Sequence, residues 1–276
     1  MTNRRFRFTP SLVVDQLSSR LYKNRGAALL EALRNAAVAC QRKPDVWEPE
    51  RVQISVTLER DHPAVGKGMA LCIADAGHGF TDEDWERFFD IGASGRGRHG
   101  GAGQQQIGKL AALALNSRVA TDHDEGFVLF SRTSTNGHVQ MAMVTPNVIC
   151  SDNDPVRTIG QDAKELGRYR NHSGTFSLLV IPNSVLKTYE EIREQVGHRL
   201  PRLAHKAWNI KLGKDAFAPP DLVGEVKPYG NLSSHLQKTP SDKEGGIWLV
   251  DAKTGLPCVY CPDMGSEIPY PLNRKD

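Results

Sequence analysis

The chain has 276 residues, and its 35 lysines and arginines nearly balance its 32 aspartates and glutamates, so its formal net charge is only +3. Such a balance creates no strong field for a membrane surface or for nucleic acid, and nucleic-acid binding gains no support from it. No apolar run approaches the ~20 residues of a membrane-crossing helix, and no signal-peptide core follows the basic start. We therefore expect a cytoplasmic protein with one sizeable core and a smaller second region.

The five cysteines also favour a reducing compartment, because their number is odd and two of them lie in apolar stretches. Cys258 and Cys261 form a C-x-x-C pair with no second pair at zinc spacing. A local turn and a labile metal contact are both open interpretations of this pair.

Residues 26–41, GAALLEALRNAAVACQ, predict an amphipathic helix. Its apolar residues recur at helical spacing and indicate a face packed on a core: Leu29, Leu33, Ala36, Ala37 and Cys40. Glu31 and Asn35 are four residues apart and are therefore neighbours on the opposite face. Taken alone, they fit an ordinary solvated polar face.

Two strands are predicted next, at residues 51–60 and 69–75, and the second ends on Asp75. Gly77 and Gly79 follow at a two-residue spacing. A carboxylate at a strand end can accept a hydrogen bond in a partly dry pocket, and glycines let the backbone turn and a flat ring approach closely. An ordinary strand-to-loop turn, in which aspartate caps and glycine reverses the chain, produces the same D-x-G-x-G pattern.

A capped helix is predicted from Thr81 through residue 91, and the next stretch, residues 92–103, carries six glycines. So many glycines indicate a mobile loop that can close over a ligand. The loop leads into a further predicted helix, whose first turn holds Gly108 and Lys109. Backbone N–H groups at such a helix start attract phosphates.

Three more strands are predicted at residues 126–134, 138–145 and 175–182, with a polar insert at 151–174. Strands meeting two or three helices favour the α/β class, here a two-layer α/β sandwich with helices on one face of a mixed sheet. From residue 184 the pattern changes to an amphipathic helix bent at Pro201 and then a Pro/Gly-rich tail. We therefore divide the chain into a domain at 1–183 and a C-terminal region at 184–276.

In order, the acid-plus-amide helix, the D-x-G-x-G turn, the glycine-rich loop with G-K and the strand beginning Gly174-Thr175 resemble the GHKL superfamily of ATPases. These proteins share the Bergerat ATP-binding fold. The chain looks most like bacterial stand-alone ATPases related to the MORC and heat-shock chaperone branches. The resemblance spans residues 6–182 and lies in the ordered set of motifs, because no single motif carries it.

The resemblance implies that ATP and Mg²⁺ are bound. It assigns Glu31 to water activation, Asn35 to the magnesium ion that bridges the phosphates, and Asp75 to the adenine amine. The other matched positions form the turn, the phosphate-binding lid and the threonine that supports Asp75: Gly77, Gly79, Gly103, Gly108, Lys109 and Thr175.

Two departures from the family pattern bear on turnover: Val38 stands where the family usually has aspartate, and Gln106 stands where it usually has glycine. We therefore keep two interpretations, a slow Mg-dependent ATPase that acts as a conformational switch and a nucleotide-sensing scaffold that binds ATP without turnover. A third, a non-nucleotide α/β interaction protein, requires the motif order to be coincidence.

The C-terminal region is short for the transducer domain that follows the ATPase domain in larger relatives. The resemblance therefore implies a homodimer or a protein partner that completes the activity. An apolar stripe in this region offers a contact surface, and the simpler interpretation is that it packs on the ATP-binding domain: Ile192, Val196, Leu200 and Leu203.

Overall fold

The computed structural model describes residues 9, 11–12, 25–40, 52–89, 107–135, 137–151, 154–197, 209–216, 227–228, 236–240, 247–251 and 257–261. For residues 107–109, 197 and those beyond 216 the description covers the backbone alone. The chain forms two compact units, one of Met1–Val196 with Asn209–Phe217 and the other of Gly197–Trp208 with Ala218–Asp276. The glycine-rich segment expected to be a mobile lid, including Gly103 and Gln106, lies outside the described residues.

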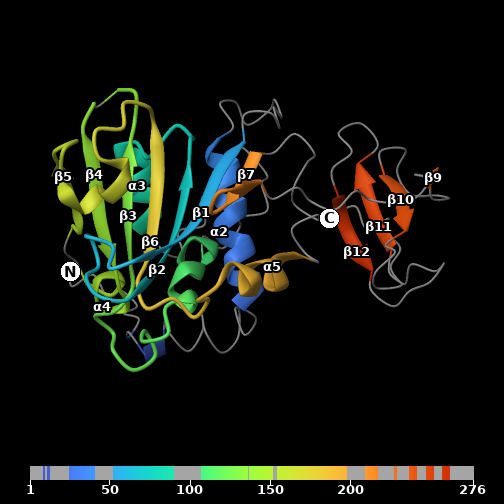
Figure 1. Ribbon diagram of the computed structural model, residues 1–276, viewed down its shortest axis with the longest axis horizontal. Coiled ribbons are helices and arrows are strands. Elements are labelled where there is room, and N and C mark those ends of the chain that lie inside the picture. The colour runs from blue at the N-terminus through green and yellow to red at the C-terminus, as the bar shows by residue number, and fades with distance from the viewer. Residues whose placement is uncertain are drawn as a thin grey trace, which may run out of the picture. The chain divides into compact units, whose positions relative to one another are not determined.

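The first unit is built on an eight-stranded sheet in the order β5-β4-β3-β6-β2-β1-β7-β8 (Figure 1). Its strands are β1 (Gln53–Arg60), β2 (Met69–Asp75), β3 (Phe127–Arg132), β4 (Val139–Val144), β5 (Val156–Ile159), β6 (Phe176–Ile181), β7 (Asn209–Leu212) and β8 (Asp215–Ala216). Neighbouring strands run antiparallel except β1 and β7, which are parallel. A mixed sheet with helices confirms the predicted α/β class, and the two-layer sandwich is compatible with it.

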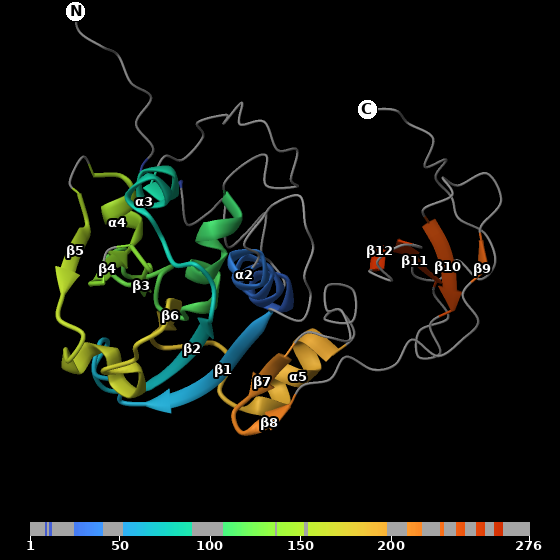
Figure 2. The same ribbon diagram turned by 90° about the horizontal axis from the view of Figure 1, so that it is seen from above.

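The helices are α2 (Arg25–Ala39), α3 (Asp82–Phe89), the short α4 (Pro146–Ile149), α5 (Tyr189–Gly197) and two 3-10 helices, η3 (Ile107–Leu115) and η4 (Lys164–Tyr169). Figure 2 shows α2, η3 and α3 on one side of the sheet, which we call the front face. The predicted apolar stripe holds α2 there, since Leu29, Leu33, Ala36 and Ala37 are buried where α2 packs on β1, β2 and η3.

The opposite, back face of the sheet has its own apolar core. Because side chains alternate along a strand, Ala70, Cys72 and Ala74 of β2 point to this face, whereas Asp75 points to the front. Leu166 of η4 is fully buried against the back face. The central strands are therefore covered on both sides.

The polar insert at 151–174 contributes the edge strand β5 and helix η4. Leu166 is the residue that fixes η4 to the sheet. The predicted helix with Gly108 and Lys109 in its first turn forms as the 3-10 helix η3, which at nine residues is longer than such helices usually are.

Elements α5, β7 and β8 follow residue 184 but belong to the first unit. The Tyr189 hydroxyl accepts the N–H of Leu58 in β1 at 3.1 Å, and Ile192 and Val196 are fully buried. This half of the predicted apolar stripe therefore packs within the unit, and Leu200 and Leu203 lie outside the described residues. The boundary after residue 183 was placed where the sequence pattern changes, and it stays a prediction.

The second unit contains a four-stranded antiparallel sheet in the order β12-β11-β10-β9, which the sequence had indicated only as a tail. Its strands are β9 (Lys227–Pro228), β10 (Leu236–Pro240), β11 (Ile247–Asp251) and β12 (Pro257–Cys261), and both cysteines of the C-x-x-C pair fall in β12.

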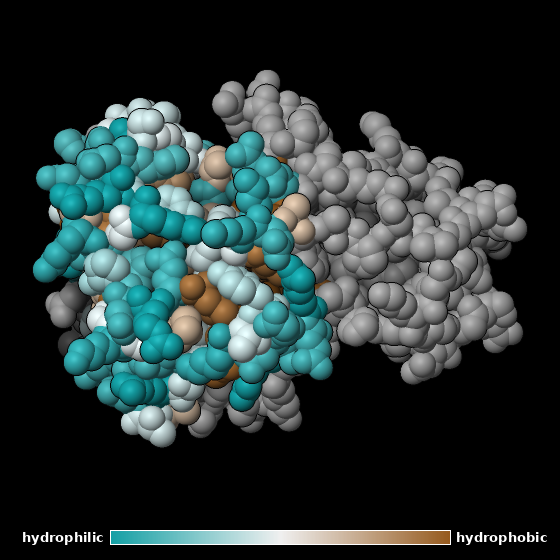
Figure 3. Space-filling model, in the orientation of Figure 1, coloured by the Kyte–Doolittle hydropathy of each residue, from teal (hydrophilic) through white to brown (hydrophobic). Residues whose placement is uncertain are grey.

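The described surface in Figure 3 is mostly hydrophilic, with hydrophobic residues showing in small separate areas. Two large apolar side chains with high exposure are Val38 of α2 and Met143 of β4. Among the described residues, no helix combines the length and the apolar character needed to cross a membrane.

Candidate functional site

The D-x-G-x-G turn connects β2 to α3 and is tied to the C-terminal end of α2. Asp75 is only 8% exposed, and its Oδ1 accepts the N–H of Gly77 at 2.9 Å. The carbonyl oxygen of Ala39 accepts the backbone N–H of His78 at 3.0 Å and lies 2.8 Å from Nδ1 of the same residue. The turn is therefore fixed against α2 by two contacts to one carbonyl.

Both glycines of the turn are required by close backbone packing. A Cβ on Gly77 would lie 2.5 Å from the Ala39 carbonyl oxygen, and one on Gly79 would overlap the carbonyl of Arg132. Gly79 also has a φ of 75°, in the left-handed region. The fold therefore explains the two glycines whether or not a flat ligand approaches them.

We expect Gly79→Ala to lower the free energy of unfolding much more than Gly66→Ala. Gly66 has nearly the same φ, 77°, but a Cβ there meets nothing within 4 Å, so its substitution costs only the left-handed backbone, about 1 to 2 kcal/mol. The overlap with Arg132 adds about 1 to 3 kcal/mol at Gly79. Urea unfolding of both variants measures the difference, and equal losses would show that the contact at Gly79 is relieved without cost.

A row of polar side chains crosses the front face at the level of this turn. Asp75 of β2 pairs with Ser177 of β6, which pairs with Ser131 of β3, which pairs with Gln140 of β4. Sequence reasoning selected Thr175, which precedes β6 and is partly buried, whereas Ser177 lies directly opposite Asp75. The two-residue spacing of Thr175 and Ser177 in a strand was the available signal for Ser177.

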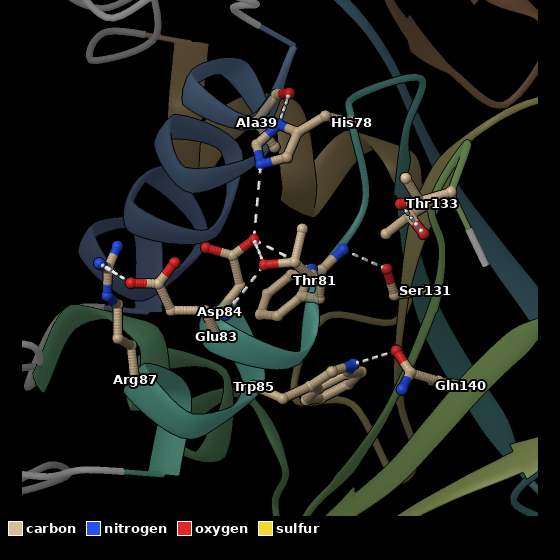
Figure 4. A network of polar contacts seen from close by, with 12 residues as sticks. Ala39, His78, Thr81, Glu83, Asp84, Trp85, Arg87, Ser131, Thr133 and Gln140 are labelled. Carbon is tan, nitrogen blue, oxygen red and sulfur yellow. Dashed lines mark hydrogen bonds and ion pairs between the residues drawn. The ribbon is translucent and has the colours of Figure 1, made fainter.

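Helix α3 and the residues before it satisfy one end of this row (Figure 4). Ser131 accepts the N–H of Phe80 at 2.6 Å, and the Gln140 side chain accepts from the Trp85 indole at 2.8 Å. Gln140 also donates to Asp82 at 3.0 Å. Helix α3 is thereby held on the sheet by its polar contacts as well as by its aromatic face.

The other end of the row lacks such partners. The hydroxyl of Ser177, a residue 4% exposed, is the one buried side-chain polar atom in the described part of the chain that has no hydrogen bond. Buried polar groups are almost always paired, so an orphan of this kind calls for a functional or solvent partner. Ser177 pairs with Asp75 across β6 and β2.

The electrostatics of Asp75 follow from its burial, which raises the pKa of the carboxyl to about 7. The N–H of Gly77 and the backbone and hydroxyl of Ser177 oppose this rise. The Ser177 hydroxyl is thus near enough to lower the pKa of Asp75, but its geometry falls short of a hydrogen bond. A carboxyl near half ionisation at neutral pH, beside an unpaired hydroxyl, marks a functional-site candidate.

The remaining predicted residues lie on elements that pack against this region. Glu31 and Asn35 are on α2, where the Glu31 carboxylate is 3.7 Å from the Arg34 guanidinium and Asn35 is exposed. Helix α2 packs on η3, whose first turn contains Gly108 and Lys109, and η3 also contacts β6. The structure therefore brings together α2, β2, β6 and η3, the elements that carry the predicted residues.

Comparison with models of protein families found no match for this chain, and comparison with curated proteins found none either.

Proposed function

We propose that this chain binds ATP at the Asp75 site and hydrolyses it slowly with Mg²⁺, as a conformational switch of the GHKL type. The observation that carries the proposal is the buried Asp75 carboxyl beside the unpaired Ser177 hydroxyl. A carboxylate accepts a hydrogen bond from an amine, and a hydroxyl can donate to a ring nitrogen. The exposed edge of adenine presents both of these groups.

The phosphate side of the proposed site comes from α2 and η3. The first backbone N–H groups of η3 have no partner within their own helix, so they suit an anion. Asn35 offers an amide oxygen to Mg²⁺. Glu31 would act as general base, and its partly exposed pair with Arg34 is weak enough, at about 0 to 1 kcal/mol, to be given up.

The nucleotide-sensing scaffold is the second candidate, and the surface of α2 favours it. Val38 is 58% exposed, one helical turn beyond Asn35, and presents a methyl surface where the resembling family usually has a carboxylate. Loss of that acid removes a polar group from the adenine side of the site and leaves ATP binding possible without efficient hydrolysis. Phosphate release from the wild-type protein separates the two candidates.

We also propose a cytoplasmic location and a homodimer or protein partner. The buried thiols Cys40 and Cys72, both outside any disulfide, support a reducing compartment.

A titration with fluorescent ATP, with and without Mg²⁺, tests binding. At pH 8 we expect Asp75→Asn to weaken ATP binding about 10- to 100-fold, because an amide replaces a charged acceptor, which is worth about 1.5 to 3 kcal/mol. Asp122→Asn makes the same charge change at an exposed residue and should leave the affinity unchanged. Equal affinity of wild type and Asp75→Asn, or no binding by wild type, would remove the site assignment.

A further inference from the structure

A second group of chemically reactive side chains lies on the back face, on the other side of the sheet from Asp75. Glu59 of β1, His62 of the following turn and Cys72 of β2 each offer one ligand atom, and these atoms all lie within 4.8 Å of one another. His62 is 2% exposed and Cys72 is fully buried. The proposed nucleotide site uses none of the three. We propose that they form a binding site for a zinc ion.

The Glu59 carboxylate is already oriented for this role. Its Oε1 accepts the Thr57 hydroxyl at 3.1 Å and lies 3.3 Å from Nε of Arg168. Its Oε2 lies 3.8 Å from Nε2 of His62, too far for a hydrogen bond. Contacts that hold one carboxylate oxygen while the other faces the ion are typical of metal sites.

The distances suit a tetrahedral ion after small movements. Ligand atoms bound to Zn²⁺ at 2.0 to 2.3 Å lie roughly 3.5 Å from one another, so side-chain shifts of about 1 Å suffice. Sulfur, imidazole and carboxylate together match Zn²⁺ better than Mg²⁺ or Ca²⁺, which prefer oxygen. The thiolate and carboxylate balance the two charges of the ion, while Arg168 keeps its contact with Oε1.

The ring of His62 can bind a metal ion through either nitrogen once that nitrogen carries no proton. Its Nδ1 accepts the N–H of Ala64 at 3.2 Å, which places the ring proton on Nε2. Metal binding at Nε2 moves that proton to Nδ1 and gives up this long hydrogen bond. The Cys72 thiol releases its proton to solvent as the metal–sulfur bond forms.

Helix η4 provides an independent observation, because it places a glycine beside the ligand nitrogen. Gly167 interrupts η4 with φ 54° and ψ −124°, a conformation that other residues avoid. A Cβ on Gly167 would lie 3.0 Å from Nε2 of His62. A glycine-only conformation thus occurs where a side chain would crowd the proposed ion.

Cobalt(II) is the probe, because a cobalt–thiolate bond gives a charge-transfer absorption that reports sulfur ligation directly. The full chain should carry Cys258→Ser and Cys261→Ser, which removes the C-x-x-C pair as a competing site. We expect this protein to bind one equivalent of cobalt with a thiolate band that zinc abolishes by displacement. Cys72→Ser should lose the band, and Cys40→Ser, at a buried thiol of α2's C-terminal end, should keep it.

Absence of a thiolate band in the parent protein, or its persistence in Cys72→Ser, would overturn the proposal. If circular dichroism shows that Cys72→Ser does not fold, Glu59→Gln decides instead. That variant should keep the thiolate band while binding cobalt about 10-fold more weakly or worse, and unchanged affinity would also overturn the site.

Discussion

At pH 8, Asp75→Asn is expected to make the first compact unit more stable than wild type, although the substitution alters a buried and hydrogen-bonded residue. The pKa of Asp75 is raised from 3.8 to about 7 by burial. Between these values the folded protein binds a proton that the unfolded chain has lost, so the free energy of unfolding falls as pH rises from about 4 to 7. Asparagine does not titrate, so the free energy of unfolding of the variant does not fall for this reason as the pH rises.

Most of the difference should develop between pH 5 and pH 8. At pH 5 the Asp75 carboxyl of the folded protein is still protonated, whereas the unfolded chain has already lost most of this proton, so about 1 to 2 kcal/mol of the difference is already present. By pH 8 the wild type has lost about a further 2 to 3 kcal/mol relative to the variant, since one pKa unit corresponds to 1.36 kcal/mol. For a unit of this size, that is about 5 to 10 °C in the midpoint of thermal unfolding.

Thermal unfolding across this pH range measures the effect, with Asp122→Asn as the control for the loss of one exposed charge. In Asp75→Asn the new side-chain amide can still accept the N–H of Gly77 through its oxygen, and its amino group can donate to the unpaired Ser177 hydroxyl. Parallel pH profiles for wild type and Asp75→Asn would mean that Asp75 does not titrate near neutrality.

Because Asp75 destabilises the fold at neutral pH, its presence is better explained by a functional role than by stability. The hydrogen bond that Asp75 accepts from Gly77 could be made equally well by asparagine. Functional sites commonly retain residues of this kind at the expense of stability. A stability gain in Asp75→Asn together with a loss of ATP binding would place Asp75 in that class.

Several elements of the first unit could be predicted from the spacing of apolar residues along the sequence. In β1, Ile54 and Val56 follow the two-residue period of a strand, and in α2, Leu29 and Leu33 follow the period of a helix. Tertiary contacts did not override either local preference. Asp75 was also placed correctly at the end of its strand. An apolar run that ends in an acid followed by glycines can be recognised from the sequence alone.

The unpredicted parts depend on contacts between distant segments. Ser177 becomes notable only through the register of β6 against β2, which fixes its place opposite Asp75. Helix η4 is set by the burial of Leu166 inside a polar run, and β7 joins β1 across a long sequence separation. The Glu59–His62–Cys72 group likewise appears only when β1 and β2 pair.

Glu31→Ala is expected to keep ATP binding and to lower the rate of phosphate release about 100-fold or more, as removal of a general base does. Glu31 lies on α2 with its carboxylate 3.7 Å from Arg34, outside the buried core, so the fold should tolerate alanine there. Steady-state phosphate release and fluorescent-ATP binding, measured on the same preparation, separate chemistry from affinity.

The matched control is Glu83→Ala, because Glu83 is also a helical glutamate paired with an arginine, here Arg87 one turn later. The control removes a comparable surface ion pair, worth up to about 1 kcal/mol, without touching the proposed site. Equal rates in wild type, Glu31→Ala and Glu83→Ala would assign the base to another residue. If wild type binds ATP but releases no phosphate above background, the scaffold function replaces the ATPase, and the exposed Val38 becomes the first position to restore as aspartate.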